Sequence, residues 1–403
     1  MPFGLDQAAS LKRQARLLVP EVVDDTLAIS RVPAPTGHEQ GRALLVRDLF
    51  RRDDPGRLVY VDRAGNVVTR IPGRRRDRSL LVAAHLDTVF GPDVPHTPAL
   101  VGSRLVGPGI GDNGVALAAM VALPRLLTRS RIVPACDIVL VATVGEEGYG
   151  NLRGMTAALD ANREAAAVVA IEGHGLGRIT HIAVGSRRVA IRIDGPGGHS
   201  WADYGRPSAV VAAGQLVARL SDISVPDWPR STLNVASIHG GSAINAIATT
   251  AAIEVEVRSM DGIVLEGLLA EVVRQMRLVE RDGLAIRMET LGVRPAGALP
   301  ADHLIVRRAR AVLATLGTAS ASDASSTDAN VPIALGMPAV CVGISHGGEA
   351  HTPHEWLERE PIATGLAQLG LLSRILAEDI ENGDLRRQGW SQSGSSPISA
   401  ASD

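Results

Sequence analysis

The segment LVAAHLDTVFGP (81–92) begins as an apolar run and ends in polar residues. The run LLVAA (80–84) is short and fully apolar, which is typical of a strand buried in a sheet. His85 and Asp87 follow it, and side chains at alternate positions of an extended segment point to the same side. We therefore expect both to emerge at the carboxyl end of a buried strand, where open α/β sheets bind their ligands. A purely structural His–Asp hydrogen bond is the alternative for this pair taken alone.

The chain on both sides of this strand alternates apolar strands with helices. Such alternation predicts an α/β domain with a doubly wound, mixed and largely parallel sheet. Two helices are expected between Pro20 and Phe50, with Thr36 and Glu39 as a capping box at the start of the second. The other predicted strands are 58–62, 66–71, 137–144, 166–172 and 338–344, and the other predicted helices are 115–127 and 151–161.

The pattern changes near residue 185 to β-α-β-β-α-β, with helices expected at about 207–220 and 263–281. This order predicts a ferredoxin-like α+β domain, an antiparallel sheet with two helices on one face. Helix–strand alternation returns after Pro300, so the second domain is inserted into the first. A Ser- and Gly-rich tail at the end has too few apolar residues to order itself. The expected ranges are 1–185 and 296–384 for the two parts of the first domain, 186–295 for the inserted domain and 385–403 for the tail.

Composition limits the classes of function. The 403 residues carry 41 basic and 43 acidic side chains, so no overall field attracts nucleic acid or an anionic membrane. No stretch approaches the ~20 apolar residues of a membrane span, and the N-terminus lacks the apolar core of a signal peptide. Cys136 and Cys341 lie in apolar runs and are expected to be buried thiols. We therefore expect a cytoplasmic protein.

Acidic and imidazole side chains also follow other predicted strands. They are Asp112 in a Gly-rich loop before a helix, the adjacent pair Glu146 and Glu147, Glu172, and His351. Taken singly, Asp112 is explained as well by an N-cap. The glutamate pair on its own favours a site, because adjacent like charges are costly unless a metal or a proton compensates them, and an exposed surface pair is its alternative. Together with His85, however, all of them fall at one edge of one predicted sheet. Mixed imidazole and carboxylate ligands suit Zn²⁺, with Co²⁺ or Mn²⁺ as substitutes, and a bridging carboxylate suits a two-metal site.

The motifs HLDT, GDNG and GEEG, the acid at a strand end and the late histidine resemble those of the M20 family of peptidases and deacylases. The resemblance covers almost the whole chain. It implies a zinc-hydrolase domain, an inserted dimerisation domain and two bound Zn²⁺ ions. The implied ligands are Asp112 as the bridge, His85 and Glu172 for one ion, and Glu147 and His351 for the other.

The same resemblance implies roles for two further acids. Glu146 corresponds to the general base, and Asp87 to the residue that hydrogen-bonds His85 and fixes its tautomer. The family also often has a cis peptide bond after the bridging acid, which here is the bond between Asp112 and Asn113.

In the inserted domain, His199 of the motif GGHS resembles a family residue that reaches the active site of the partner subunit, which implies a homodimer. Asn245 and Arg258 match positions that contact a carbonyl or carboxylate of the substrate, and the planar fork of arginine suits a carboxylate. A solvated loop histidine, a turn asparagine and an exposed strand arginine are the alternatives. The segment 325–330 resembles a loop of tripeptidase-like members, and either helix capping or substrate contact would explain it.

These features predict hydrolysis of amide bonds in small substrates. The first expectation is an exopeptidase that acts on short peptides. The alternative is an N-acyl-amino-acid deacylase with the same metals, because the metal motif does not separate the two. A non-catalytic binding protein would be marked by loss of Glu146 or of a ligand, and neither is lost.

Overall fold

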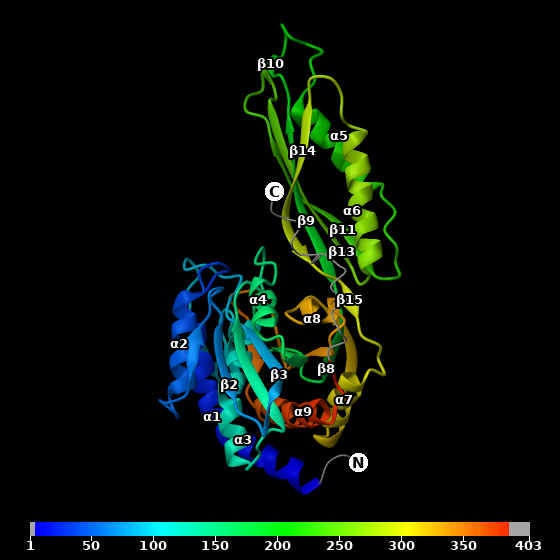
Figure 1. The fold of residues 1–403 in the computed structure, drawn as a ribbon. Helices are drawn as coiled ribbons and strands as arrows, with labels where there is room; N and C mark the ends of the chain where they lie inside the picture. The colour runs from blue at the N-terminus through cyan, green and yellow to red at the C-terminus, as the bar shows by residue number, and fades with distance from the viewer. Residues whose placement is uncertain (1–4, 387–403) are drawn as a thin grey trace. The chain divides into compact units, whose positions relative to one another are not determined.

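The computed structural model describes residues 5–386 and separates into two compact units (Figure 1). Within that range the first unit contains the residues up to Ala183 and those from Ala298 onward, and the second contains Val184–Gly297. The tail predicted at 385–403 lies outside the described residues except for its first two. Of these, Leu385 is buried in the core of the first unit.

The first unit is built on a nine-stranded mixed sheet. Its strand order is β1-β2-β6-β3-β7-β17-β8-β15, and β16 pairs with β8. The strands are β1 (Val59–Val61), β2 (Val67–Ile71), β3 (Arg75–His85), β6 (Cys136–Thr143), β7 (Ala165–Glu172), β8 (Arg178–Ala183), β15 (Gly297–Ala298), β16 (Ala321–Ser325) and β17 (Ala339–Gly343). The helices are α1 (Leu5–Ser30), α2 (Gln40–Arg51), α3 (Val115–Arg129), α4 (Arg153–Ala161), α7 (Leu304–Thr315), α8 (Asn330–Ala334) and α9 (Ile362–Asn382).

The central strands β6, β3, β7 and β17 run parallel and are covered on both faces, which confirms the doubly wound fold. Leu80 and Val82 of β3 pack into an apolar core shared with α1, α3 and α9. Leu81 and Ala83 point the other way, into a second core shared with α4 and α8. Because the four strands are parallel, their carboxyl ends meet at one edge of the sheet.

Two predictions for the N-terminal helices are wrong. α1 begins at Leu5, well before the expected start at Pro20, and continues through that proline. Burial of apolar residues such as Leu11 stabilises this helix although proline removes a backbone hydrogen bond. The expected capping box does not form, because neither Thr36 nor Glu39 caps α2 with its side chain. Both side chains bond instead to more distant segments.

A small sheet of order β18-β19-β5-β4 has no counterpart in the sequence predictions. Strands of two or three residues are too short to show a period. This sheet joins the segment before α3 to the segment before α9. Its strands are β4 (Ala99–Val101), β5 (Arg104–Val106), β18 (Gly347–Gly348) and β19 (Trp356–Glu358).

One helical stretch among the described residues, Ile110–Arg129, is long and apolar enough to cross a membrane by length and composition. It includes α3, and 89% of its apolar window is buried inside the protein. Its residues pack with α1 and α9 against the central sheet. The stretch is therefore a helix of the core. Cys136 and Cys341 are buried free thiols, as predicted.

The second unit has the predicted β-α-β-β-α-β order and an antiparallel sheet with strand order β11-β13-β9-β14. Apolar residues of α5 and α6 pack together on this sheet. The two short strands β10 and β12 pair with each other in a separate antiparallel ladder. The elements are β9 (Gly185–Asp194), β10 (Gly198–His199), α5 (Ala209–Ser221), β11 (Ser231–Gly240), β12 (Ala246–Ile247), β13 (Thr250–Ser259), α6 (Gly262–Arg277) and β14 (Ala285–Arg294).

Candidate metal centre

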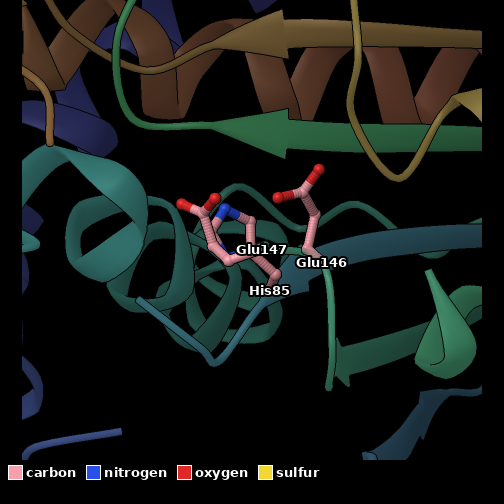
Figure 2. A group of neighbouring side chains, drawn as sticks. All are labelled: His85, Glu146 and Glu147. Carbon is pink, nitrogen blue, oxygen red and sulfur yellow. The ribbon is translucent and has the colours of Figure 1, made fainter. Parts of the chain in front are cut away.

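Imidazole and carboxylate side chains gather at the carboxyl edge of the central sheet, where β3, β6 and β7 end. They form three overlapping groups, and within each group the possible ligand atoms lie within 4.8 Å of one another. The groups are His85–Glu146–Glu147, His85–Asp112–Glu172 and Asp112–Glu147–His351. Figure 2 shows the first of them, with its side chains at the ends of β3 and β6. The structure thus brings together all five residues predicted as ligands, and Glu146 with them.

The imidazole of His85 is buried and has partners at both nitrogens. Its Nδ1 lies 3.0 Å from the backbone carbonyl oxygen of Asp87 and 3.6 Å from the carboxylate of that residue. Because a carbonyl only accepts, this hydrogen bond places the proton on Nδ1 and leaves Nε2 as the nitrogen that can bind a metal. Nε2 faces Asp112 Oδ1 at 2.9 Å and Glu172 Oε2 at 3.6 Å. Asp87 therefore fixes the tautomer of His85 through its backbone carbonyl, and its carboxylate lies beside the same nitrogen.

The carboxylate of Asp87 instead holds the turn that carries the two glutamates. It accepts hydrogen bonds from the backbone N–H of Glu146 at 3.0 Å and of Glu147 at 2.8 Å, and from the hydroxyl of Thr36 at 2.9 Å. Burial by itself raises the pKa of Asp87, but interaction with His85 and with these backbone groups outweighs burial and lowers it. The ionised carboxylate of Asp87 thus fixes the backbone of Glu146 and Glu147.

Asp112 stands between two of the groups. It lies in the irregular turn η1 (Ile110–Gly114) just before α3, and its peptide bond to Asn113 is cis, as the resemblance implied. Its Oδ1 lies 2.9 Å from His85 Nε2, and its Oδ2 lies 3.1 Å from His351 Nε2. The same His351 nitrogen is 3.4 Å from Glu147 Oε1. The two oxygens of Asp112 therefore face different groups, as a bridging ligand requires.

The pKa shifts in these groups follow from the crowding of buried acids. Burial raises the pKa of Glu172 to about 7, against the lowering effect of His85. Burial also acts to raise the pKa of Asp112, but hydrogen bonds from His351 and His85 hold it far below its usual range. Hydrogen bonds to Asp112 and Glu147 raise the pKa of His351 to about 10. Since a cation stabilises crowded carboxylates and replaces imidazole protons, this donor set fits divalent metal ions.

Glu355 is a buried residue of the site that sequence reasoning missed. Its carboxylate accepts hydrogen bonds from the backbone N–H of Gly109 at 2.8 Å, of Gly111 at 3.2 Å and of Asp112 at 2.8 Å. It also lies 2.6 Å from Nε2 of His174. Because the small sheet of β19 and β5 brings Glu355 to η1, no local spacing signals the contact. Glu355 therefore orients the turn that presents Asp112.

Glu355→Gln is expected to lower metal affinity and kcat together, by about 10- to 100-fold. An amide has one accepting oxygen in place of two, so it cannot serve all three backbone N–H groups. Metal titration and steady-state kinetics measure the two effects. The matched control is Glu360→Gln, an exposed carboxylate of the same segment, which should change neither value. A Glu355→Gln protein with wild-type metal affinity would show that this acid does not position Asp112.

Arg42 of α2 is a second residue that the sequence did not reveal. Its guanidinium is fully buried and donates to the backbone carbonyls of Val32, at 3.1 and 2.8 Å, and of Leu86, at 2.8 Å. Burial lowers the pKa of Arg42 to about 10 although Asp87 and Asp112 act to raise it, so it remains a cation at neutral pH. A fixed positive charge thus lies beneath the turn that follows β3.

In the second unit the structure brings His199 and Asn245 together but leaves Arg258 apart. β10 pairs with β12, and the amide of Ser200 donates to the carbonyl of Asn245 at 3.0 Å. His199 and Asn245 are both exposed. Arg258 lies at the other end of β13, where its Nε contacts Glu256 Oε2 at 2.8 Å. The roles of these three residues toward a substrate stay predictions.

The segment 325–330 does not cap α8 with a side chain, so the capping explanation is wrong. The hydroxyl of Thr327 accepts a hydrogen bond from the amide of Ala329 in the turn before α8, and contact with a substrate stays a prediction. The buried carboxylate of Asp328 accepts a hydrogen bond from the hydroxyl of Thr143, the last residue of β6. Through this hydrogen bond the segment contacts the end of β6, the strand that precedes the glutamate pair.

Comparison with known proteins gives a match to one family. The model described as peptidase family M20/M25/M40 matches residues 81–374 of the chain. This range contains every residue of the three groups at the sheet edge. It also contains the whole of the second unit.

Solved structures share the fold over nearly the whole chain. A tripeptidase from Staphylococcus aureus subsp. aureus Mu50 is similar with a TM-score of 0.77 at 21% identity, over 89% of this chain and 99% of that one. A dinuclear metal-binding peptidase of the M20 family from Bacillus subtilis is similar with a TM-score of 0.67 at 16% identity, over 90% of this chain and 99% of that one. Identities this low show a common fold.

Curated sequences match over a shorter length. A protein described as a probable carboxypeptidase from Aspergillus terreus is 29% identical over 215 residues, which are 49% of this chain and 48% of that protein. The chain spans about half the length of the curated relatives that it matches.

Proposed function

Because the chain belongs to the M20/M25/M40 peptidase family, we propose that it is a two-metal exopeptidase that hydrolyses short peptides. The observation that carries the proposal is Asp112, whose two oxygens face His85 and His351 at 2.9 and 3.1 Å. Two cation sites that share one carboxylate are typical of hydrolases with two metals. The similar tripeptidase and the curated probable carboxypeptidase support short peptides as the substrate class.

The donor set suits two Zn²⁺ ions, with Co²⁺ or Mn²⁺ as substitutes. His85, Asp112 and Glu172 would hold one ion. Asp112, Glu147 and His351 would hold the other. When bound, such ions supply Lewis acidity, which lowers the pKa of water and polarises the carbonyl of an amide.

Glu146 carries the proton transfers of the proposed reaction. Its carboxylate lies in one group with His85 and Glu147, and its backbone is fixed by Asp87. As general base it takes the proton of the attacking water while the water oxygen bonds to the amide carbon. As general acid it then gives that proton to the leaving nitrogen when the C–N bond breaks. The products are a carboxylic acid and an amine.

A substrate panel tests the proposed function. The metal-loaded protein is assayed side by side on di- and tripeptides with free or blocked termini and on N-acetyl amino acids. We expect cleavage of unblocked short peptides, loss of activity on chelation, and its return with Zn²⁺, Co²⁺ or Mn²⁺. Cleavage of N-acetyl amino acids without peptide cleavage would make the protein a deacylase instead. Absence of both activities in the metal-loaded protein would contradict an enzymatic function.

We further propose a homodimer in which His199 of the partner subunit completes each active site. His199 is exposed on β10, and the nearby Trp201 and Tyr204 are 87% and 91% exposed. Exposed aromatic side chains next to a functional histidine are typical of an interface between proteins. Sedimentation of the purified protein tests for the dimer.

Mixing two inactive variants tests whether His199 acts across the dimer. His199→Ala and Glu146→Gln proteins are combined at equal concentration and allowed to exchange subunits. A mixed dimer has one site with both wild-type residues, so about a quarter of wild-type activity should return. Each variant alone, at the same total concentration, is the control. If the mixture stays as inactive as the separate variants after exchange is shown, His199 acts within its own subunit or not at all.

A further inference from the structure

A cavity of about 740 Å³ lies in the first unit, next to the residues that lead into the glutamate pair. Its walls are the start of α2, the turn between β1 and β2, the end of β6 and the start of α4. Volumes of this size are ordinary for small-molecule sites. None of the residues in the three candidate metal groups lines this cavity.

Three arginines, Arg47, Arg63 and Arg153, line the cavity together with two acids. Both acids already have partners. Glu39 is buried, and its Oε1 accepts hydrogen bonds from the amides of Gly37 and Gly145 and from Arg153. Of the three arginines, Glu39 therefore contacts Arg153, and Arg47 is paired instead with Asp48 at 2.8 Å.

The second acid, Asp62, is occupied by its own turn. Its carboxylate accepts hydrogen bonds from the backbone N–H of Ala64, Gly65 and Asn66 at 2.8 to 2.9 Å, and from the side chain of Asn66 at 2.9 Å. Within residues 5–386 the exposed Arg63 side chain has no hydrogen bond or ion pair. Among the described residues, Arg63 is thus the arginine of the cavity whose charge no direct contact with an acid compensates.

Part of the cavity wall is apolar. Leu44 and Val61 line it and are 40% and 41% exposed, and Val144 forms part of its inner wall. Arginine forks bind carboxylate and phosphate groups, whereas exposed leucine and valine gain free energy when an apolar body covers them. The lining therefore matches a small molecule with an anionic group and an apolar part.

Two walls of the cavity also accept hydrogen bonds from the backbone of Val144 and Gly145, the residues just before Glu146. Glu39 accepts the hydrogen bond of the Gly145 amide at 3.1 Å, and the side chain of Asn66, on the turn between β1 and β2, accepts that of the Val144 amide at 3.0 Å. Arg153 donates to Glu39 at 2.7 Å. Glu146 follows Gly145 directly. A ligand that draws Arg153 away from Glu39 would alter the hydrogen bond that fixes the residue before Glu146.

We propose that this cavity binds a small organic anion through Arg47, Arg63 and Arg153, and that binding changes the rate of hydrolysis at the neighbouring site. The binding step does not depend on the proposed function, because it uses none of the residues of the metal centre. The effect on rate rests on the proposed function.

Titration calorimetry on the metal-loaded protein tests the binding step, with inorganic phosphate and 4-methylpentanoate as probes. We expect saturable binding of at least one probe, weakened by about tenfold or more in Arg47→Ala/Arg63→Ala. The control is Arg13→Ala/Arg76→Ala, which removes two exposed arginines elsewhere in the same unit and should bind as the wild type does. Any binding of the probes at the metal centre appears equally in all three proteins.

The outcomes separate the parts of the proposal. Tighter binding of 4-methylpentanoate than of phosphate supports the role of Leu44 and Val61, and equal binding supports recognition of the anionic group alone. No saturable binding to the wild type, or equal binding to Arg47→Ala/Arg63→Ala, would overturn the site. If binding depends on the arginines, the rate of peptide hydrolysis with and without the tighter probe tests the coupling, and an unchanged rate would overturn it.

Discussion

Glu146→Gln is expected to lower kcat by about 10²- to 10⁴-fold while the protein keeps its bound metal. The change preserves the shape of the side chain and removes the oxygen that takes the proton from water. The hydrogen bond to Asp87 uses the main-chain N–H of residue 146, so the turn keeps its anchor. Steady-state kinetics on the best peptide of the panel and metal analysis of the dialysed protein measure the two quantities separately.

The matched control is Glu280→Gln, which removes an exposed carboxylate of the second unit and should leave kcat unchanged. Wild-type turnover in Glu146→Gln would refute its role as the base. Loss of metal from this variant would instead make Glu146 a ligand, as its place beside His85 and Glu147 allows. The metal analysis therefore decides between two chemical roles for one side chain.

Asp112→Ala is expected to retain less than one equivalent of metal after dialysis and to lose its activity. Each of the two proposed sites loses a ligand, because Asp112 belongs to both groups. Asp112→Asn keeps the shape but removes the negative charge, so its metal content should fall between those of the wild type and Asp112→Ala. Elemental analysis and activity are measured on the same preparations.

The control for this series is Asp93→Ala, an exposed acid between β3 and β4, which should keep both metal and activity. Circular dichroism of each variant shows whether the fold is retained. A folded Asp112→Ala protein with undiminished metal content would refute the shared carboxylate, and with it the observation that carries the proposed function.

The sheet and its polar edge were predictable because both depend on local pattern. The run 80–84 is apolar because β3 is covered by helices on both faces. His85 is the last residue of β3, and Glu172 is the last residue of β7. Both therefore lie at the edge of the helix layers that cover the sheet. Parallel strands bring such ends together without any further information from the sequence.

The supporting residues were not predictable because their partners lie far away in the chain. Thr36 fits a local capping rule, yet its hydroxyl donates to Asp87, 51 residues away. Glu355 meets the amide of Asp112 across 243 residues. Arg42 lies in a helix whose pattern does not distinguish a buried cation from a solvated one. Tertiary contacts therefore determine the positions and partners of these three side chains.

The hydrogen bonds between Glu355 and η1 form only after the inserted unit has been synthesised. A chain made as far as Gly297 contains β3, β6 and β7 but lacks Glu355, His351 and β17, the neighbour of β7. The turn of Asp112 then has no carboxylate to orient it, and one of the two proposed cation sites lacks a ligand. Because His351 and Glu355 follow the inserted unit in the chain, the candidate metal centre is complete only after that unit has been translated.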